Sequence, residues 1–235
     1  MTVKLLICDD DPDIGEVVSF AAGIIWPTCQ VKKATNGNDA LRLFHETSPD
    51  LIVLDVGMPP PNGFEVCKRI REVSQVPIIM LTAHHATADK IKAFEIGVDD
   101  FVTKPFDSLE LLARMRALVR RVSGVHDQAF MQPAQEIVIG DLLMNTATRE
   151  VRVKGEPIHL TSTEYKLLEE MARHVGTVLS HDTLLRRVWG PEYEGEERYL
   201  KVFVRRLRQK LGDNTKKPRY IQTEWGVGYR VVPQS

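Results

Sequence analysis

Five polar side chains in the first half of the sequence each stand at the end of an apolar run. They are Asp9, Asp10, Asp55, Thr82 and Lys104. The run before Asp55, residues 51–54, consists of Leu, Ile, Val and Leu, and such a run is typical of a strand that is buried on both faces. Ligands of an open α/β sheet bind beyond the carboxyl ends of its strands. We therefore expect the five side chains to meet at one edge of a parallel sheet.

The chemistry of this group would be metal binding and phosphoryl transfer. Carboxylates that converge on one point repel each other unless a cation lies between them, and hard oxygen ligands suit Mg²⁺. A carboxylate can also attack phosphorus to form an aspartyl-phosphate. A lysine ammonium and a hydroxyl group can neutralise and position the transferred group. The alternative, that all five are ordinary turn residues, needs several coincidences, so we favour a magnesium-dependent site at Asp55.

The elements that must position these side chains alternate between strands and helices. Helical spacing predicts a helix after each strand; the first follows Asp11 and Pro12, a cap with a proline behind it, and the fourth ends at Gly97. Five alternating units imply a parallel sheet with right-handed crossovers. The strands are predicted at residues 3–8, 31–34, 51–55, 77–81 and 101–103, and the last helix at residues 108–121.

Residues 1–121 resemble the receiver domain of a two-component response regulator. The resemblance rests on Asp9-Asp10, on Asp55 with Pro59 and Gly63, on Thr82-Ala83 and on Lys104-Pro105-Phe106. It implies an α/β flavodoxin-like fold with strand order 2-1-3-4-5 and a cis Lys104–Pro105 bond. The implied roles are phosphoacceptor for Asp55, Mg²⁺ ligands for Asp9, Asp10, Asp55 and the Gly57 carbonyl, phosphoryl contacts for Thr82 and Lys104, and aromatic switch for Phe101.

Two features beside this site are less typical of receiver domains. Gly57 removes a side chain two residues after Asp55, and the run Pro59-Pro60-Pro61 stiffens the loop that follows. In the receiver resemblance, Gly57 and His84 border the path of an attacking water, so we expect an altered rate of autodephosphorylation. For His84 and His85, the simpler interpretation is two solvated loop residues, and a metal role is not predicted.

Residues 89–121 carry charges of both signs at a density that intramolecular stability does not explain, because exposed ion pairs contribute little. A two-fold interface uses the same patch twice, and matched charges then fix its register. This stretch resembles the face through which OmpR/PhoB regulators form their active dimer. The pairs that the resemblance implies are Lys90 with Glu110, Glu95 with Arg116, and Asp100 with Arg114.

Composition sets further bounds on the protein. Its 235 residues are enough for two domains, and the net charge is -1. The three cysteines, Cys8, Cys29 and Cys67, are widely spaced, so we expect that they form neither a disulfide framework nor a zinc site. This cysteine usage favours a protein of a reducing compartment. No apolar run approaches the roughly 20 residues of a spanning helix, and the acidic residues after the first strand do not fit a signal peptide. We therefore predict a cytoplasmic protein without a membrane partner.

The second half of the sequence predicts a small α+β domain. Residues 122–135 lack an apolar period and are typical of a flexible linker, so the domain is placed at residues 136–235. A capping box at Thr161 and Glu164 opens its first helix. The other predicted elements are strands at 137–139 and 151–153, helices at 181–189 and 196–211, and a hairpin with strands at 220–223 and 229–232.

The helix predicted at residues 196–211 presents basic side chains away from the domain core. Leu200, Val204, Leu207 and Leu211 form an apolar stripe, and arginines and lysines stand at three- and four-residue steps on the opposite side. A solvated basic face would explain this helix considered alone. The hairpin beside it favours a wing, however, and a helix in the major groove with phosphate contacts around it is the expected DNA-binding geometry.

Residues 136–232 resemble the winged helix-turn-helix effector domain of the OmpR/PhoB family. The signature comprises Leu160-Thr161, Val188-Trp189-Gly190, residues 204–211 and Gly226-x-Gly228-Tyr229-Arg230. Trp225 stands where the family frequently has an arginine, so the minor-groove contact of that arginine is not implied, and the wing is expected to contribute packing in its place. The implied DNA contacts are base edges for Lys201 and Arg206, and further contacts for Arg198, Arg205, Arg208, Trp189, Thr223 and Tyr229.

The two halves together predict a transcriptional regulator that a cognate histidine kinase phosphorylates on Asp55. Phosphorylation would favour a homodimer that binds repeated half-sites in double-stranded promoter DNA; RNA polymerase is a further candidate partner. A magnesium-dependent phosphohydrolase is one alternative, but Gly57 stands where such an enzyme has its second acid. A DNA-binding protein indifferent to phosphate is the other alternative, which the complete acidic set disfavours. We therefore predict no enzyme activity beyond the protein's own phosphorylation and dephosphorylation.

Overall fold

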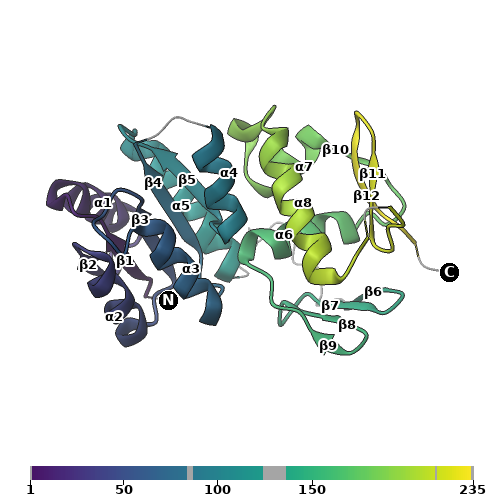
Figure 1. Ribbon diagram of the computed structural model, residues 1–235, viewed down its shortest axis with the longest axis horizontal. Helices are drawn as coiled ribbons and strands as arrows, with labels where there is room; N and C mark the ends of the chain where they lie inside the picture. The colour runs from purple at the N-terminus through teal and green to yellow at the C-terminus, as the bar shows by residue number, and fades with distance from the viewer. Residues whose placement is uncertain (1, 84–86, 124–135, 215, 234–235) are drawn as a thin grey trace. The chain divides into compact units, whose positions relative to one another are not determined.

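The chain divides into two compact units, Met1–Ser123 and Gly124–Ser235. Each unit has its own sheets and its own buried apolar residues. Most of the predicted linker lies outside the described residues, so the linker stays a prediction. The computed structural model shown in Figure 1 describes residues 2–83, 87–123, 136–214 and 216–233.

The first unit contains a five-stranded parallel sheet in the order β2-β1-β3-β4-β5, which confirms the predicted order. Its strands are β1 (Lys4–Cys8), β2 (Gln30–Ala34), β3 (Leu51–Asp55), β4 (Ile78–Thr82) and β5 (Asp100–Thr103). Every residue of β3 and β4 is buried, as expected for the central strands of a parallel sheet that is covered on both faces. Because the strands are parallel, their carboxyl ends lie at the same edge.

Helices cover both faces of this sheet (Figure 1). They are α1 (Pro12–Ile25), α2 (Gly37–Thr47), α3 (Gly63–Val73), α4 (Thr87–Ile96) and α5 (Ser108–Ser123). α1 and α5 pack together, and the buried cluster beneath them includes Val18 of α1 and Met115 of α5. The predicted start of α1 is confirmed, because the Asp11 side chain accepts a hydrogen bond from the first turn and Pro12 opens the helix.

A buried ion pair holds the edge of the sheet opposite to the carboxyl ends of the strands. The Arg71 guanidinium lies 2.8 Å from Asp99 Oδ2 and donates hydrogen bonds to the backbone carbonyls of Val76 and Gly97. The same Asp99 oxygen accepts a hydrogen bond from the backbone N–H of Ile78. One polar network thus joins the end of α3, the start of β4 and the turn after α4.

We predict that Asp99→Ala lowers the free energy of unfolding by about 3–5 kcal/mol, because it leaves the buried Arg71 charge without its counterion. The matched control is Glu46→Ala, which removes a partner from the exposed Arg42–Glu46 pair and should cost less than about 1 kcal/mol. Urea denaturation of the full chain measures both values. Similar effects of the two substitutions would contradict a stabilising role for the buried network.

The second unit contains a three-stranded sheet, order β10-β12-β11, and a four-stranded sheet, order β6-β7-β8-β9, both antiparallel. β7, β9 and β10 were not predicted, because β7 begins with three consecutive apolar residues and does not alternate, and two residues are too few to show a period. The strands are β6 (Glu136–Ile139), β7 (Leu142–Asn145), β8 (Glu150–Val153), β9 (Glu156–Pro157), β10 (Leu179–Ser180), β11 (Ile221–Glu224) and β12 (Gly228–Val231).

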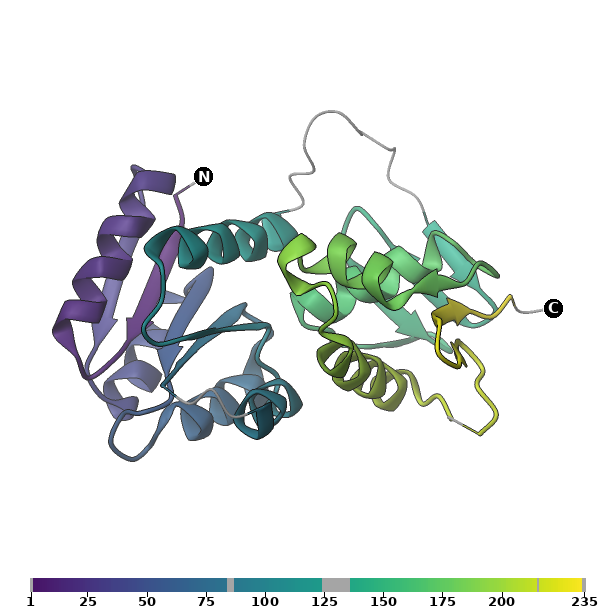
Figure 2. The same cartoon turned by 90° about the horizontal axis from the view of Figure 1, so that it is seen from above.

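Three α-helices lie between these strands in the described part of the second unit. They are α6 (Ser162–Ala172), α7 (His181–Val188) and α8 (Glu197–Leu211), with a short 3-10 helix, η2 (Pro191–Tyr193), before α8. The predicted capping box is confirmed at Thr161 and Glu164. All four residues of the predicted apolar stripe of α8 are buried, so α8 packs on the core as expected. Figure 2 shows α8 and the β11–β12 hairpin that follows it from a second direction.

The turn between β6 and β7 is tied to the segment that leads into β11. Asp141 accepts hydrogen bonds from the Tyr220 hydroxyl and, at 2.6 Å, from the Arg219 guanidinium. Burial, together with the hydrogen bond to Asp141, raises the pKa of Tyr220 to about 12. The hydroxyl therefore keeps its proton and stays a donor at neutral pH. The start of the hairpin is anchored to the four-stranded sheet by these contacts.

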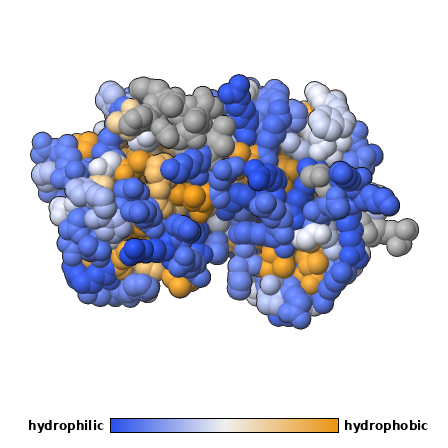
Figure 3. All heavy atoms as spheres, viewed as in Figure 1, coloured by the Kyte–Doolittle hydropathy of each residue, from blue (hydrophilic) through white to orange (hydrophobic). Residues whose placement is uncertain are grey.

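No helix within the described ranges is long and apolar enough to cross a membrane. On the face that Figure 3 shows, hydrophobic residues form small groups among hydrophilic ones.

Cys8 and Cys67 are buried, Cys29 is partly exposed, and all three are free thiols.

Candidate functional site

The five predicted side chains lie at the carboxyl edge of the parallel sheet. Asp9 and Asp10 directly follow β1, Asp55 ends β3, Thr82 ends β4 and Lys104 directly follows β5. Ligand oxygens of the three carboxylates lie within 4.8 Å of one another. Lys104 donates a hydrogen bond to Asp9 across 95 residues of sequence. The topology of the sheet therefore assembles a cluster that no local segment could form.

Lys104 supplies the positive charge of this cluster. Its Nζ lies 2.7 Å from Asp9 Oδ2 and 3.0 Å from Asp55 Oδ1. Asp9 and Asp55 are buried, whereas Asp10 is exposed. The cluster thus has one ammonium, paired with two of its three carboxylates, and the negative excess together with the hard oxygen donors suits a divalent cation.

Burial and ion pairing act in opposite directions on the pKa values of the cluster. Burial raises the pKa of Asp9, and the hydrogen bond from Lys104 offsets part of this effect. Burial by itself lowers the pKa of Lys104, but its hydrogen bonds to Asp9 and Asp55 outweigh burial, so the pKa of Lys104 is raised. Lys104 therefore stays protonated at neutral pH and can hold a negatively charged group beside Asp55.

Two glycines let the loop after β3 fold closely around Asp55. The Gly57 backbone N–H donates a hydrogen bond of 3.0 Å to Asp55 Oδ2, and a Cβ at Gly57 would lie 3.0 Å from that oxygen. A Cβ at Gly63 would lie 2.1 Å from the Asp55 carbonyl oxygen, so glycine is required where α3 approaches β3. The effect of Gly57 on autodephosphorylation stays a prediction, and His84 lies outside the described residues.

Thr82 ends β4, the strand next to β3, and Phe101 lies on β5, the edge strand beyond β4. Thr82 is buried, and its backbone carbonyl accepts a hydrogen bond of 2.7 Å from the Lys104 N–H. Phe101 is buried and packs edge-on against Phe94, with 5.4 Å between the ring centroids. The Lys104–Pro105 bond is cis, which confirms that expectation. The roles of Thr82 as a phosphoryl contact and of Phe101 as a switch stay predictions.

The charges predicted to pair between subunits differ in exposure. Glu95 on α4 and Arg116 on α5 are exposed. Arg114 pairs within its own chain, because its guanidinium lies 3.2 Å from Asp100 Oδ1 and 2.7 Å from Glu110 Oε1. An intermolecular pair of Asp100 with Arg114 would therefore compete with an existing intramolecular one.

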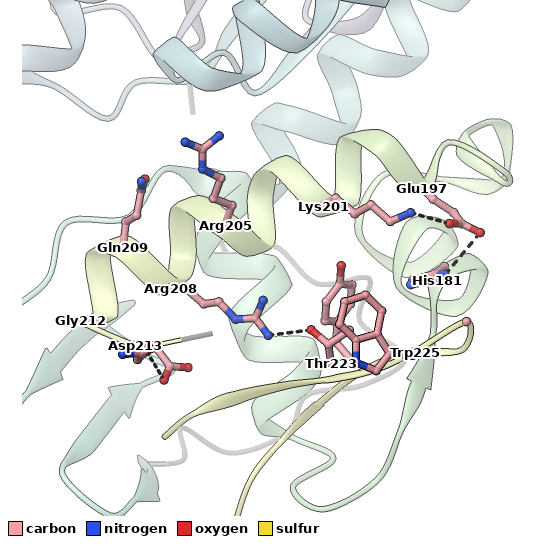
Figure 4. A pocket seen from close by; sticks show the side chains of 13 residues that line it. His181, Glu197, Lys201, Arg205, Arg208, Gln209, Gly212, Asp213, Thr223 and Trp225 are labelled. Carbon is pink, nitrogen blue, oxygen red and sulfur yellow. Dashed lines mark hydrogen bonds and ion pairs between the residues drawn. The ribbon is translucent and has the colours of Figure 1, made fainter. Parts of the chain in front are cut away.

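In the second unit, α8 presents an exposed basic row. Arg198, Lys201 and Arg205 are exposed, and their three- and four-residue steps place them on one face of the helix. A groove of about 780 Å³ lies between α8 and the β11–β12 hairpin. Figure 4 shows the groove with Lys201, Arg205 and Arg208 on α8 and with Thr223 and Trp225 on the hairpin.

Arg206 does not belong to this exposed row. It is 9% exposed, and its guanidinium lies 2.7 Å from Oε1 of Glu164, which is fully buried. Lys210 lies 2.7 Å from Oε2 of the same carboxylate. An arginine that neutralises a buried carboxylate is not available to a base edge. The predicted base contact of Arg206 is therefore corrected to a structural role that joins α6 to α8.

Four further residues predicted to contact DNA are partly or fully enclosed. Arg208 Nη2 donates hydrogen bonds to the Ile221 carbonyl at 2.8 Å and to Thr223 Oγ1 at 2.9 Å, so Arg208 ties α8 to the hairpin. Tyr229 is buried, with its ring centroid 5.9 Å from the Arg208 guanidinium carbon. Trp189 is buried edge-on against a phenylalanine of α8. These contacts shape the groove, and the DNA contacts of these residues stay predictions.

The groove also contains residues that were not predicted. Gln209 continues the row of Lys201 and Arg205 at a four-residue step, a signal that was present in the sequence. His181 lies at the start of α7, with its Nδ1 3.4 Å from Glu197 Oε1, and the other oxygen of Glu197 lies 3.0 Å from Lys201. No spacing relates His181 to α8, because only the packing of α7 against α8 brings them together.

Comparison with known proteins identifies a domain family for each of the two units. Residues 5–116 match the response regulator receiver domain, and residues 155–231 match the family described as transcriptional regulatory protein, C terminal. The chain is 32% identical to DrrB, an OmpR/PhoB homologue from Thermotoga maritima; the match covers 99% of this chain and 100% of that chain, with a TM-score of 0.52. A point mutant of RitR, 24% identical over 99% of this chain and 100% of that chain, shares the fold with a TM-score of 0.73.

The fold, the acidic cluster and the two matched domains define a two-component response regulator with a DNA-binding output domain. More narrowly, the chain belongs to the OmpR/PhoB family of response regulators, since its identity to the Thermotoga protein extends over both units.

Proposed function

We propose that transfer of a phosphoryl group from a sensor histidine kinase to Asp55 switches this regulator. The observation that carries the proposal is the place of the Asp55 carboxylate, which lies within the acidic cluster and 3.0 Å from the Lys104 ammonium. In the transfer, an Asp55 oxygen bonds to phosphorus while the bond from phosphorus to the donor's histidine nitrogen breaks, and its electron pair stays on the imidazole. Lys104, held by Asp9, neutralises charge on the acceptor.

Mg²⁺ is the proposed cofactor of this step. The carboxylates of Asp9, Asp10 and Asp55 and the Gly57 carbonyl would hold it, since all are hard oxygen donors. When bound, the ion supplies positive charge to the oxygens of the transferred group. The test is the mass of the intact protein after incubation with acetyl phosphate. It should gain one phosphoryl group in the presence of Mg²⁺ and none after chelation.

A homodimer formed through α4, β5 and α5 is the proposed consequence of phosphorylation. Glu95 and Arg116 are exposed and opposite in charge. A two-fold axis would bring Glu95 of one subunit next to Arg116 of the other, and the same pair would form a second time with the subunits exchanged. Thr82 and Phe101 would link this face to the phosphorylated Asp55. The Lys90 side chain lies outside the part of the chain that the structure describes.

Arg116→Glu is expected to weaken dimerisation of the phosphorylated protein about tenfold or more, because it places like charges opposite each other. Adding Glu95→Arg should restore dimerisation by rebuilding the pair with the signs exchanged. Analytical ultracentrifugation measures both effects, and Arg42→Glu, on an exposed face of α2, is the control without effect. Arg114 is unsuitable for this test because its reversal would also break its ion pair with the buried Asp100 of the same chain. If the double variant dimerises as weakly as Arg116→Glu alone, the proposed pairing of Glu95 with Arg116 is contradicted.

The dimer is proposed to bind repeated half-sites in promoter DNA through α8 and the β11–β12 hairpin. The exposed Arg198, Lys201 and Arg205 can neutralise phosphates, and the Gln209 amide suits the edge of an adenine. Two linked domains bind two half-sites more tightly than either domain binds one. The proposed place of action is the cytoplasm, and RNA polymerase is a further proposed partner.

A further inference from the structure

Trp225 differs in exposure from the tryptophan in the core of its own unit. It is 90% exposed, whereas Trp189 is 4% exposed. It lies at the tip of the β11–β12 hairpin, directly before Gly226, whose φ of 74° forms the turn. A buried tryptophan removes about 150–250 Å² of surface from water. An indole that is left in water at a projecting tip therefore indicates a surface that meets a partner.

The groove beside Trp225 indicates the chemistry of that partner. Lys201, Arg205 and Arg208 form the helix wall, and Trp225 and Thr223 form the hairpin wall (Figure 4). Cations on one side and an aromatic ring on the other suit a ligand with phosphates along its edge and apolar sugar and base surfaces between them. Double-stranded DNA has this arrangement.

We propose that Trp225 packs its indole against deoxyribose and base atoms beside the half-site that α8 contacts. The inference rests on the DNA binding proposed above and adds a contact of a different kind to it. An arginine at this position would neutralise a phosphate and release a counterion, whereas an indole releases none. The wing of this regulator therefore contributes affinity that salt does not weaken.

The hairpin is held in place before any ligand arrives. The Val227 carbonyl at its tip accepts a hydrogen bond of 3.0 Å from the His181 N–H at the start of α7. A Cβ at Gly228 would lie 1.9 Å from the Leu179 carbonyl oxygen, so β12 packs directly on β10. Arg208 ties the other strand to α8. A hairpin fixed on both sides loses little conformational freedom on binding, so the contact of Trp225 is available at low entropic cost.

The experiment compares Trp225→Ala and Trp225→Arg with wild type in the full phosphorylated chain. The probe is a labelled duplex recovered by wild-type protein from a random-sequence library. Trp225→Ala should bind about five- to a hundredfold more weakly at every salt concentration, the range expected when an aromatic contact with a base is lost. Its slope of log affinity against log salt should equal that of wild type. Trp225→Arg should regain affinity at low salt with a slope steeper by about 0.9.

Hydroxyl-radical footprinting of the same complexes locates the contact. Trp225→Ala should lose protection of the sugars beside the half-site and keep protection at the half-site itself. Phe20→Ala, which removes an exposed aromatic side chain of α1, outside the proposed dimer face, is the matched control without effect.

An affinity and a footprint of Trp225→Ala equal to those of wild type would overturn the inference. An unchanged affinity combined with weaker dimerisation would also overturn it, because Trp225 would then contact a second copy of this chain and not DNA. The proposed DNA binding is tested separately by Arg198→Ala. If Arg198→Ala weakens binding and Trp225→Ala does not, only the contact of the wing fails. If wild type binds no duplex, the proposed function fails as well.

Discussion

Asp55→Asn should abolish both the phosphorylation of this protein and the gain in DNA affinity that phosphorylation produces. The amide of asparagine is not a nucleophile toward phosphorus, and the neighbouring carboxylates, Asp9 and Asp10, do not end β3 beside the Gly57 N–H as Asp55 does. The size of the second effect follows from dimerisation, since linking two binding modules can raise overall affinity by about 10²–10⁴-fold. Intact-protein mass and fluorescence anisotropy on a labelled duplex, each with and without acetyl phosphate, measure the two losses.

The control for Asp55→Asn is Asp13→Asn, the same chemical change at an exposed position in the first turn of α1. It should leave both readouts as in wild type. The experiment also separates the proposed function from its alternatives. Equal DNA affinity of wild type and Asp55→Asn under all conditions would favour a DNA-binding protein that is indifferent to phosphate. Repeated turnover of a small phosphate ester by wild type would favour a phosphohydrolase.

Arg205→Ala and Arg206→Ala should have opposite phenotypes although the two residues are adjacent. Arg205 is exposed in the groove, so its loss should weaken DNA binding and reduce the salt slope by about 0.9 while changing stability by less than about 0.5 kcal/mol. Arg206 neutralises the buried Glu164. Its loss should lower the free energy of unfolding, because it removes one of the two cations that neutralise this carboxylate. The expected loss is about 3 kcal/mol, the lower end of the range for a broken buried ion pair, since Lys210 remains as the second partner.

Thermal and urea unfolding of the full chain, together with anisotropy titrations at several salt concentrations, distinguish the two arginines. Both variants are measured below the unfolding midpoint of Arg206→Ala, so that weak binding is not mistaken for unfolding. Arg206→Lys serves as a further control, since it keeps the charge but lacks the planar fork of the guanidinium, and it should recover part of the lost stability. An Arg206→Ala protein as stable as wild type would return Arg206 to the candidate DNA contacts.

The chemical cluster could be predicted because it depends on topology and strand ends, which the sequence encodes locally. Continuous apolar runs identify central strands, and the first polar residue after each run identifies the strand end. Parallel pairing then requires Asp9, Asp55, Thr82 and Lys104 to lie at one edge. The apolar stripe of α8 was predictable for the same reason, since a helical period of 3.6 residues decides which face is buried.

The partners of side chains at the border between core and surface could not be predicted in this way. Arg205 and Arg206 have the same chemistry and stand one residue apart, yet a carboxylate on α6, more than 40 residues away, makes Arg206 part of the core. Arg114 likewise finds Asp100 within its own chain. Which long side chain reaches which charge depends on the packing of helices that are distant in sequence, and residue spacing within one helix carries no such information.

The sequence by itself determined the order of the elements, the edge at which the acidic cluster and Lys104 assemble, and the buried face of α8, because each follows from a local period and from the geometry of parallel strands. Only the tertiary structure decided that Arg206 belongs to the core, that Arg208 fastens the hairpin to α8, and that Trp225 projects into water beside a cationic groove. These outcomes depend on contacts between elements far apart in the chain, where burial and charge pairing are settled by packing.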